Sequence, residues 1–186
     1  MSDGTNVSSS MDRSRTRSIS PVTTRMLVKL VEAIRIVGTG IGFFLAYQSN
    51  ADPPSGEAIR ILAGTMAFVM CGTCAFEGLF LARATAREKG FDVRRDSNRR
   101  NPYQVQNSLW FLAAAIVGGA WVVFRPTDTG GLLLCVVLVL LFLLLSAANH
   151  AWEAVVHRNL TWQNLDRPIL ALAMLGGSVP ILVHYF

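Results

Sequence analysis

The chain alternates between apolar segments of membrane-spanning length and short polar segments. Each apolar segment holds roughly 20 residues, which is the length that an α-helix needs to cross about 30 Å of hydrocarbon. The pattern therefore predicts an all-α fold, a polytopic transmembrane bundle of about five spanning helices. The expected spans are residues 27–47, 60–82, 105–124, 130–152 and 168–186.

Three features of this pattern refine the expected helices. The first helix has Lys29, Glu32 and Arg35 at a spacing of three in its early turns, so these charges either reach the interface or face protein. The short polar turn from Arg125 to Thr129 joins the third and fourth helices as a hairpin. Pro168 suits the first turn of the last helix, and Pro180 should kink that helix.

The amino-terminal segment differs in composition from the rest. Residues 1–24 are rich in Ser, Thr and Arg and nearly lack large apolar side chains, which predicts a disordered basic tail ahead of a membrane domain over residues 25–186. Arg13, Arg15 and Arg17 with interleaved serines also leave open an organelle transit sequence.

Composition narrows the class of protein. The chain has 186 residues, of which 52% are hydrophobic and only 16% are charged, which excludes a soluble enzyme or a nucleic-acid-binding domain. The net charge of +5 comes from segments that flank the apolar runs, so we expect no nucleic-acid partner. The partner that the composition predicts is a lipid bilayer with an anionic inner leaflet, which would attract the basic segment of residues 83–101.

The distribution of Lys and Arg predicts the orientation. Segments on the side of the amino-terminal tail carry thirteen basic residues, whereas the opposite side carries two, Arg60 and Arg125. The positive-inside rule places the more basic side in the cytoplasm, so the amino terminus is expected there and the carboxyl terminus outside. The most fitting location is the cytoplasmic (plasma) membrane of a bacterium.

Polar side chains gather toward the cytoplasmic ends of four predicted helices. An ionisable group at membrane depth costs at least about 2.5 to 3.5 kcal/mol and therefore needs a partner or a water-lined cavity. Since the topology brings these groups to one leaflet, we treat them as a candidate ligand-binding cluster. Its members are Glu32, Arg35, Glu77, Tyr103, Gln104, Asn107, Asn149, His150 and Glu153.

Two motifs suggest chemistry without establishing it. His150, Glu153 and His157 form one stripe on a helix and could ligate a metal, but structural hydrogen bonding near the interface is the simpler interpretation, and no metal site is assigned. Cys71 and Cys74 have the spacing of redox thiols, yet they lie mid-helix in an apolar span without an evident cation to lower a thiol pKa. No glycine-rich phosphate cradle supports a phosphate-bearing ligand at the basic segment of residues 83–101. We expect no cofactor.

Several segments resemble a known family. They are Asn101-Pro102-Tyr103-Gln104 at a helix start, Asn149-His150 near the end of the next helix, and Arg158-Asn159 followed by Asn164. They are similar to an uncharacterised family of small bacterial and archaeal integral membrane proteins, known by a domain-of-unknown-function label, over about residues 60–186. That family favours Glu at position 106 and Gly at positions 149 and 158. The resemblance implies a membrane-embedded fold and no particular activity.

Three functions remain open at this stage. The first is a non-enzymatic assembly, modulatory or ligand-binding membrane protein, either homo-oligomeric or bound to another membrane protein. The second is a membrane-embedded enzyme that acts on a lipid or quinone-like substrate through Glu77, His150 and Glu153. The third is a small-solute transporter, for which no inverted repeat is evident.

Overall fold

The computed structural model describes residues 21–50, 55–88 and 102–186, and every regular element in these ranges is a helix. The elements labelled η are π-helices. In chain order the elements are α1 (Pro21–Gln48), α2 (Glu57–Gly64), η1 (Thr65–Gly72), α3 (Thr73–Phe76), η2 (Glu77–Leu81), α4 (Ala82–Glu88), α5 (Pro102–Phe124), α6 (Thr129–Val156) and α7 (Trp162–Leu182). The elements from α2 to α4 follow one another without a break and form what we call the central helix, residues 57–88.

Five helices in the described ranges are long and apolar enough to cross a membrane, which confirms the all-helical class and the number of span-length helices expected from the sequence. They are Val22–Gln48, Glu57–Thr85, Gln104–Phe124, Thr129–Val156 and Asn164–Leu182. The helical hairpin is also confirmed, because α5 ends at Phe124 and α6 begins at Thr129.

One expected boundary is wrong. The last helix begins at Trp162, so Pro168 lies inside α7 instead of in its first turn. A proline at this position removes only one backbone hydrogen bond, and the buried side chain of Asn164 holds the start of the helix by donating to the Asn159 carbonyl at 2.8 Å. At the other end of the chain, α1 begins at Pro21, ahead of the expected span of residues 27–47, where the segment from Pro21 to Thr24 supplies the first turn. Residues 1–20, where the tail is predicted, lie outside the described part.

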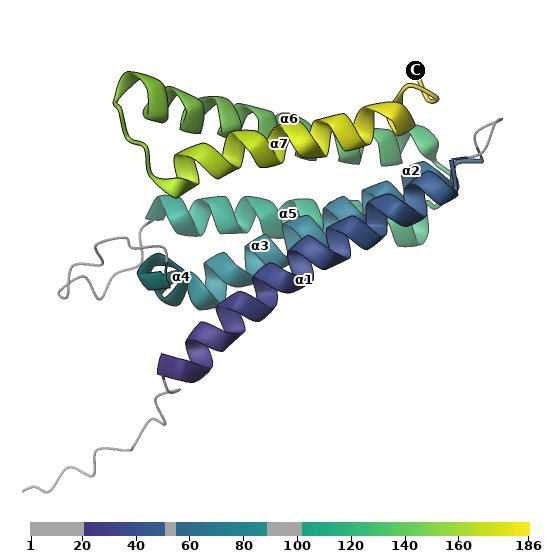
Figure 1. The fold of residues 1–186 in the computed structure, drawn as a ribbon. Coiled ribbons are helices and arrows are strands. Elements are labelled where there is room, and N and C mark those ends of the chain that lie inside the picture. Colours follow the sequence, from purple (N-terminus) through teal and green to yellow (C-terminus); the bar gives the residue numbers. More distant parts are fainter. Residues whose placement is uncertain (1–20, 51–54, 89–101) are drawn as a thin grey trace, which may run out of the picture.

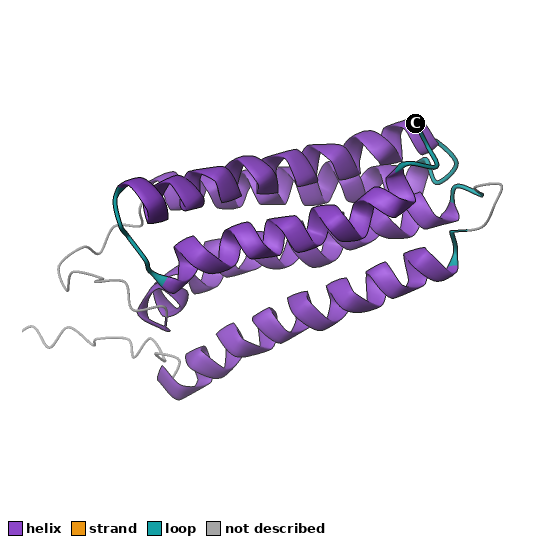
Figure 2. Cartoon of the chain, turned by 45° about the horizontal axis from the view of Figure 1, so that its top comes forward, coloured by secondary structure: helices purple, strands orange, loops and turns teal. Residues whose placement is uncertain are grey.

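The span-length helices run along a common direction and reverse at each connection (Figures 1 and 2). One end of the bundle holds the start of α1, α4, the start of α5 and the connection between α6 and α7 (Figure 1). The opposite end holds the end of α1, the start of α2, the turn between α5 and α6, and the carboxyl terminus. The predicted cluster draws its residues from helices that begin or end at the first of these ends, but Arg35 lies in the middle of α1 and Glu77 lies well inside the central helix.

The central helix is the most buried of the five span-length helices. Half of the residues in its apolar stretch are buried, whereas at most 28% of the residues in the apolar stretch of each other helix are buried. It contacts α1, α5 and α6, whereas α7 packs chiefly on α6. Ile59, Leu62 and Met66 of the central helix meet Leu132 of α6 and Ile181 of α7 in the core, and all five are fully buried.

Small residues permit the close approach of α1 and α5 to the central helix. A Cβ atom added at Gly42 would overlap the side chain of Thr65, and one added at Gly78 would overlap Ser108 of α5. Because burial of apolar surface adds little to helix association within lipid, such close backbone packing is the usual way to hold membrane helices together.

The π-helical segments keep one face of the central helix on α1. Thr65, Val69, Thr73, Glu77 and Leu81 are four residues apart, and α1 residues meet this stripe over its whole length. On an ideal α-helix, positions four apart drift by about 40° per step, or about 160° over this stripe. A π-helix has hydrogen bonds from residue i to i+5 and turns less per residue than an α-helix. The π-helical segments therefore cancel that drift. The central helix can thus present Thr73 and Glu77 to the same side of α1.

Candidate functional site

The predicted polar cluster does not close into a single site. Hydrogen bonds and ion pairs in the described part divide its members into two main groups on different helix pairs. The first group joins α1 to the central helix through Arg35 and Glu77. The second group joins the end of α6 to the start of α7 through His150.

Arg35 is the centre of the first group. Its Nη2 forms an ion pair with Oε2 of Glu77, and its Nε donates to Oγ1 of Thr73 at 2.8 Å. The Thr73 hydroxyl in turn donates to the Val69 carbonyl at 2.5 Å. The two charged side chains are 18% and 10% exposed, so the pair is largely removed from solvent. The positive charge on α1 and the negative charge on the central helix therefore neutralise each other, and the contact fixes the register between the two helices.

His150 is held by a chain of hydrogen bonds. Nδ2 of Asn164 donates to the Asn159 carbonyl at 2.8 Å, which leaves its Oδ1 directed at Nδ1 of His150 at 2.7 Å. Because a carbonyl oxygen can only accept, this orientation assigns the proton of the pair to Nδ1 of His150. The contact ties the last turns of α6 to the first turn of α7.

Glu32 is half-buried on α1 and interacts electrostatically with Arg35, so it borders the first group. Other predicted residues lie outside the two groups, and among them Gln104, Asn107 and Asn149 are exposed. Glu153 lies 4.0 Å from Nε2 of His157 on the same helix, and both side chains are well exposed. Tyr103 belongs to α5, but its side chain lies outside the described part.

Metal ligation by the His150 stripe has no support from this geometry. Nδ1 of His150 is engaged with Asn164, and His157 approaches only Glu153. Within the described residues, no group of three or more His, Cys, Asp and Glu side chains is arranged to hold a metal ion.

The opposite end of the bundle carries a separate polar contact. Asp128 caps α6 by accepting the Gly131 N–H at 2.9 Å, and its second oxygen accepts the Trp121 indole N–H at 3.0 Å. The N–H of Gly131, followed by the indole of Trp121, lowers the pKa of Asp128 below its ordinary value, because both donors favour the charged carboxylate. The contact locks the α5–α6 turn.

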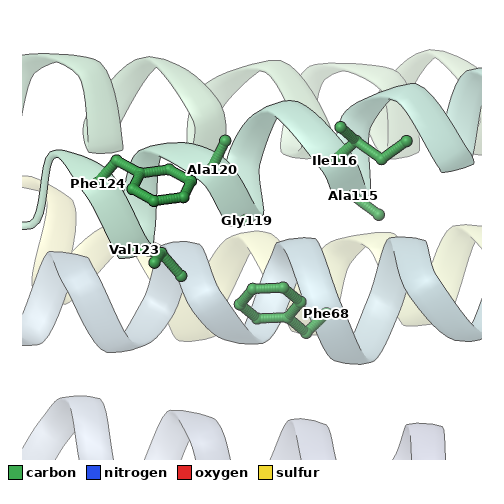
Figure 3. Close-up of a pocket in the computed structure, with 7 residues that line it drawn as sticks. All are labelled: Phe68, Ala115, Ile116, Gly119, Ala120, Val123 and Phe124. Carbon is green, nitrogen blue, oxygen red and sulfur yellow. The ribbon is translucent and has the colours of Figure 1, made fainter.

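Two grooves on the described surface are lined by apolar residues. The larger, of about 490 Å³, lies between Phe68 of η1 and the second half of α5, including Ala115, Gly119 and Phe124 (Figure 3). The smaller, of about 380 Å³, follows Ala33 to Ile41 along α1. Neither groove holds a member of the polar cluster, so they offer surface to acyl chains or apolar side chains and no catalytic groups.

The two cysteines of the central helix have surroundings that the sequence did not show. Cys71 is fully buried, and Cys74 is half-buried against the same core. Arg35 of α1 interacts electrostatically with Cys74, so a cation does lie beside this thiol. The sequence-based argument that no cation is near is therefore wrong, because that cation comes from a helix 39 positions earlier in the chain.

Sequence reasoning also missed Thr73, which shares Arg35 with Glu77. The signal that could have found it is the four-residue spacing from Thr65 to Leu81, which fits neither an α-helical stripe nor a strand.

Comparison with family models, curated proteins and solved structures found no match to this chain, so the resemblance noted in the sequence remains a prediction.

Proposed function

We propose that this chain is a multi-pass membrane protein of a bacterial cytoplasmic membrane that serves as a non-enzymatic assembly or modulatory subunit. The observation that carries the proposal is the pairing of its intramembrane polar groups. Arg35 and Glu77 are bound to each other across two helices, and His150 is bound to Asn164 across two others. A catalytic site would instead direct such groups together into one cavity.

The surface of the bundle supports placement in a membrane. Leu134, Leu145 and Ile116 lie within span-length helices, and each is more than 60% exposed. Apolar exposure of this extent is a liability in water, but it is the expected outer surface of a protein in lipid. The asymmetry in basic residues supports an amino terminus in the cytoplasm, and the basic segment of residues 83–101 would then face an anionic leaflet.

The separation of the polar groups argues against the alternative enzyme. Glu77, His150 and Glu153 belong to three different contacts, and the two grooves described above lack titratable lining. Acid–base catalysis requires its groups within hydrogen-bond reach of one substrate, and this arrangement does not bring them there.

The test is native mass spectrometry of the full chain extracted from its own membrane in mild detergent. We expect a second copy or a different membrane protein to remain bound, and no stoichiometric organic molecule. A stoichiometric organic adduct that is lost in Glu77→Gln or His150→Ala, and retained in the control Glu57→Gln, would replace this proposal with a substrate site. A bare monomer would contradict the assembly role.

A further inference from the structure

The larger apolar groove follows the seam between the central helix and the second half of α5 (Figure 3). The ring of Phe68 packs directly on the backbone of Gly119, since a Cβ atom added there would lie only 2.6 Å from the ring. Phe68, Ile116 and Phe124 line the groove and are 53%, 61% and 78% exposed. No lining residue has a polar side chain, and the complete set is Phe68, Ala115, Ile116, Gly119, Ala120, Val123 and Phe124.

The groove has the length of one leaflet of a bilayer. Its lining on α5 extends from Ala115 to Phe124, and nine steps of 1.5 Å along an α-helix cover about 14 Å. Half of the hydrocarbon core of a bilayer is about 15 Å thick. Because Phe124 is the last residue of the span-length part of α5, the groove extends from one end of this helix to about its middle. An extended acyl chain of a single lipid matches this position and length.

A cation lies at the outer end of the groove. Arg125 directly follows Phe124 and continues the last turn of α5, since its N–H donates to the Trp121 carbonyl at 2.9 Å, and its side chain is exposed. Asp128 in the same turn accepts hydrogen bonds from Gly131 and from the Trp121 indole, and it interacts with Arg125 through longer-range electrostatics. Since guanidinium groups bind phosphate oxygens well, the charge at this end of the groove complements a phosphate.

We propose that this groove binds one acyl chain of an anionic phospholipid and that Arg125 binds the phosphate of that lipid. The apolar lining accepts the chain, whereas the cation favours a headgroup of net negative charge over a zwitterionic one. The groove is open at the surface, so its lipid exchanges with the surrounding bilayer and is not retained through extraction in detergent. The inference rests on placement in a membrane and goes beyond the assembly role.

The test is photo-crosslinking of the full chain in phosphatidylcholine nanodiscs that contain a small fraction of one probe lipid. The probe is either phosphatidylglycerol or phosphatidylcholine with a diazirine on its acyl chain, and peptide mass spectrometry locates and quantifies the adducts. We expect the phosphatidylglycerol probe to label Phe68, Ile116 and Val123 about fivefold more strongly, which is the preference that one cation near an anionic headgroup supplies.

Two pairs of variants separate the headgroup from the chain. Arg125→Gln should remove the preference, so that both probes label the groove equally, whereas Arg167→Gln near the start of α7 is the matched control and should keep it. Ala120→Phe should fill the groove and reduce labelling by both probes. Ala113→Phe, two turns earlier on α5 and outside the groove, should leave labelling unchanged. Because Arg125 is exposed, its variant decides the question even where Ala120→Phe fails to fold.

Three results would overturn the site. Equal labelling of the groove by the two probes in the parent chain, or a preference that survives in Arg125→Gln, would remove Arg125 as the phosphate ligand. Groove residues that stay unlabelled while the exposed Leu109 of α5 is labelled would mean that a second copy or another protein covers the groove. That third result would remove the lipid site and support the assembly role, whereas a bare monomer with the expected labelling would support the site and contradict the assembly role.

Discussion

Arg158 is the one non-glycine residue in the described ranges with a positive φ, at 52°. This left-handed conformation follows the end of α6 and costs a residue with a Cβ atom roughly 1 kcal/mol, whereas glycine adopts it freely.

We therefore expect Arg158→Gly to stabilise the folded chain by about 0.5–1 kcal/mol. Arg167→Gly is the matched control, since it removes the same side chain from an exposed position within α7 and should destabilise by about 1 kcal/mol. Thermal unfolding of both variants in one detergent measures the difference. Equal melting temperatures in the two variants would show that backbone conformation at position 158 does not matter.

Asp128 gives a second prediction at the scale of single residues. Its pKa is lower in the folded chain than in the unfolded chain, so its contribution to stability is present above the unfolded value of about 3.9 and is lost as the pH falls through the folded value. Asparagine can still accept the Gly131 N–H but does not titrate. The melting temperature of the parent chain should exceed that of Asp128→Asn at pH 6, and the difference should shrink as the pH falls below about 4 and vanish only below the folded pKa of Asp128. A difference that does not change with pH would contradict the charged cap.

The contact between α1 and the central helix depends on a glycine that has no substitute. Gly42→Ala should destabilise by about 1–3 kcal/mol, because the added methyl group overlaps Thr65 and must separate the two helices. Gly40→Ala, two residues away on the same helix, meets no atom within 4 Å and should be neutral or slightly stabilising. Folded yield and melting temperature measure both variants. Similar losses in both would show that the cost comes from helix propensity and not from packing.

At the scale of helices, the sequence predicted the number and length of the helices, which depend on composition. It missed the contacts between helices, which depend on packing. The lengths of the apolar runs predicted the five span-length helices, because hydrophobic thickness sets a length that is visible in one dimension. The pairing of Arg35 with Glu77, and the proximity of Arg35 to Cys74, depend on the π-helical turns of the central helix. The close packing of Gly42 on Thr65 and of Gly78 on Ser108 joins residues far apart in the chain, so a reading of one helix at a time does not reveal it.

At the scale of the whole molecule, substitutions in the Arg35–Glu77 ion pair distinguish a structural role of these charges from a chemical one. Removal of one partner of a largely buried pair should cost about 3–5 kcal/mol, because the other charge is left without compensation. Replacement of both, as in Arg35→Met with Glu77→Met, should restore most of the folded yield that Glu77→Met alone loses. Yield after detergent extraction and size-exclusion chromatography gives the measurement. Folded yield that stays low in the double variant would mean that the charges do more than neutralise each other.

The orientation in the membrane remains a prediction from the distribution of basic residues. In the predicted topology, thirteen of them belong to segments on the side of the amino terminus and two to segments on the other side, and the described ranges hold five candidate spans, an odd number. A topology reporter fused after Phe186 should therefore be active outside the cytoplasm, while one fused before residue 1 should be active inside. A reporter inserted at Thr127, in the α5–α6 turn, should agree with the one after Phe186, because both lie at the same end of the bundle. Agreement between the reporters at the two termini would contradict five spans, whereas inversion of all three would contradict only the orientation.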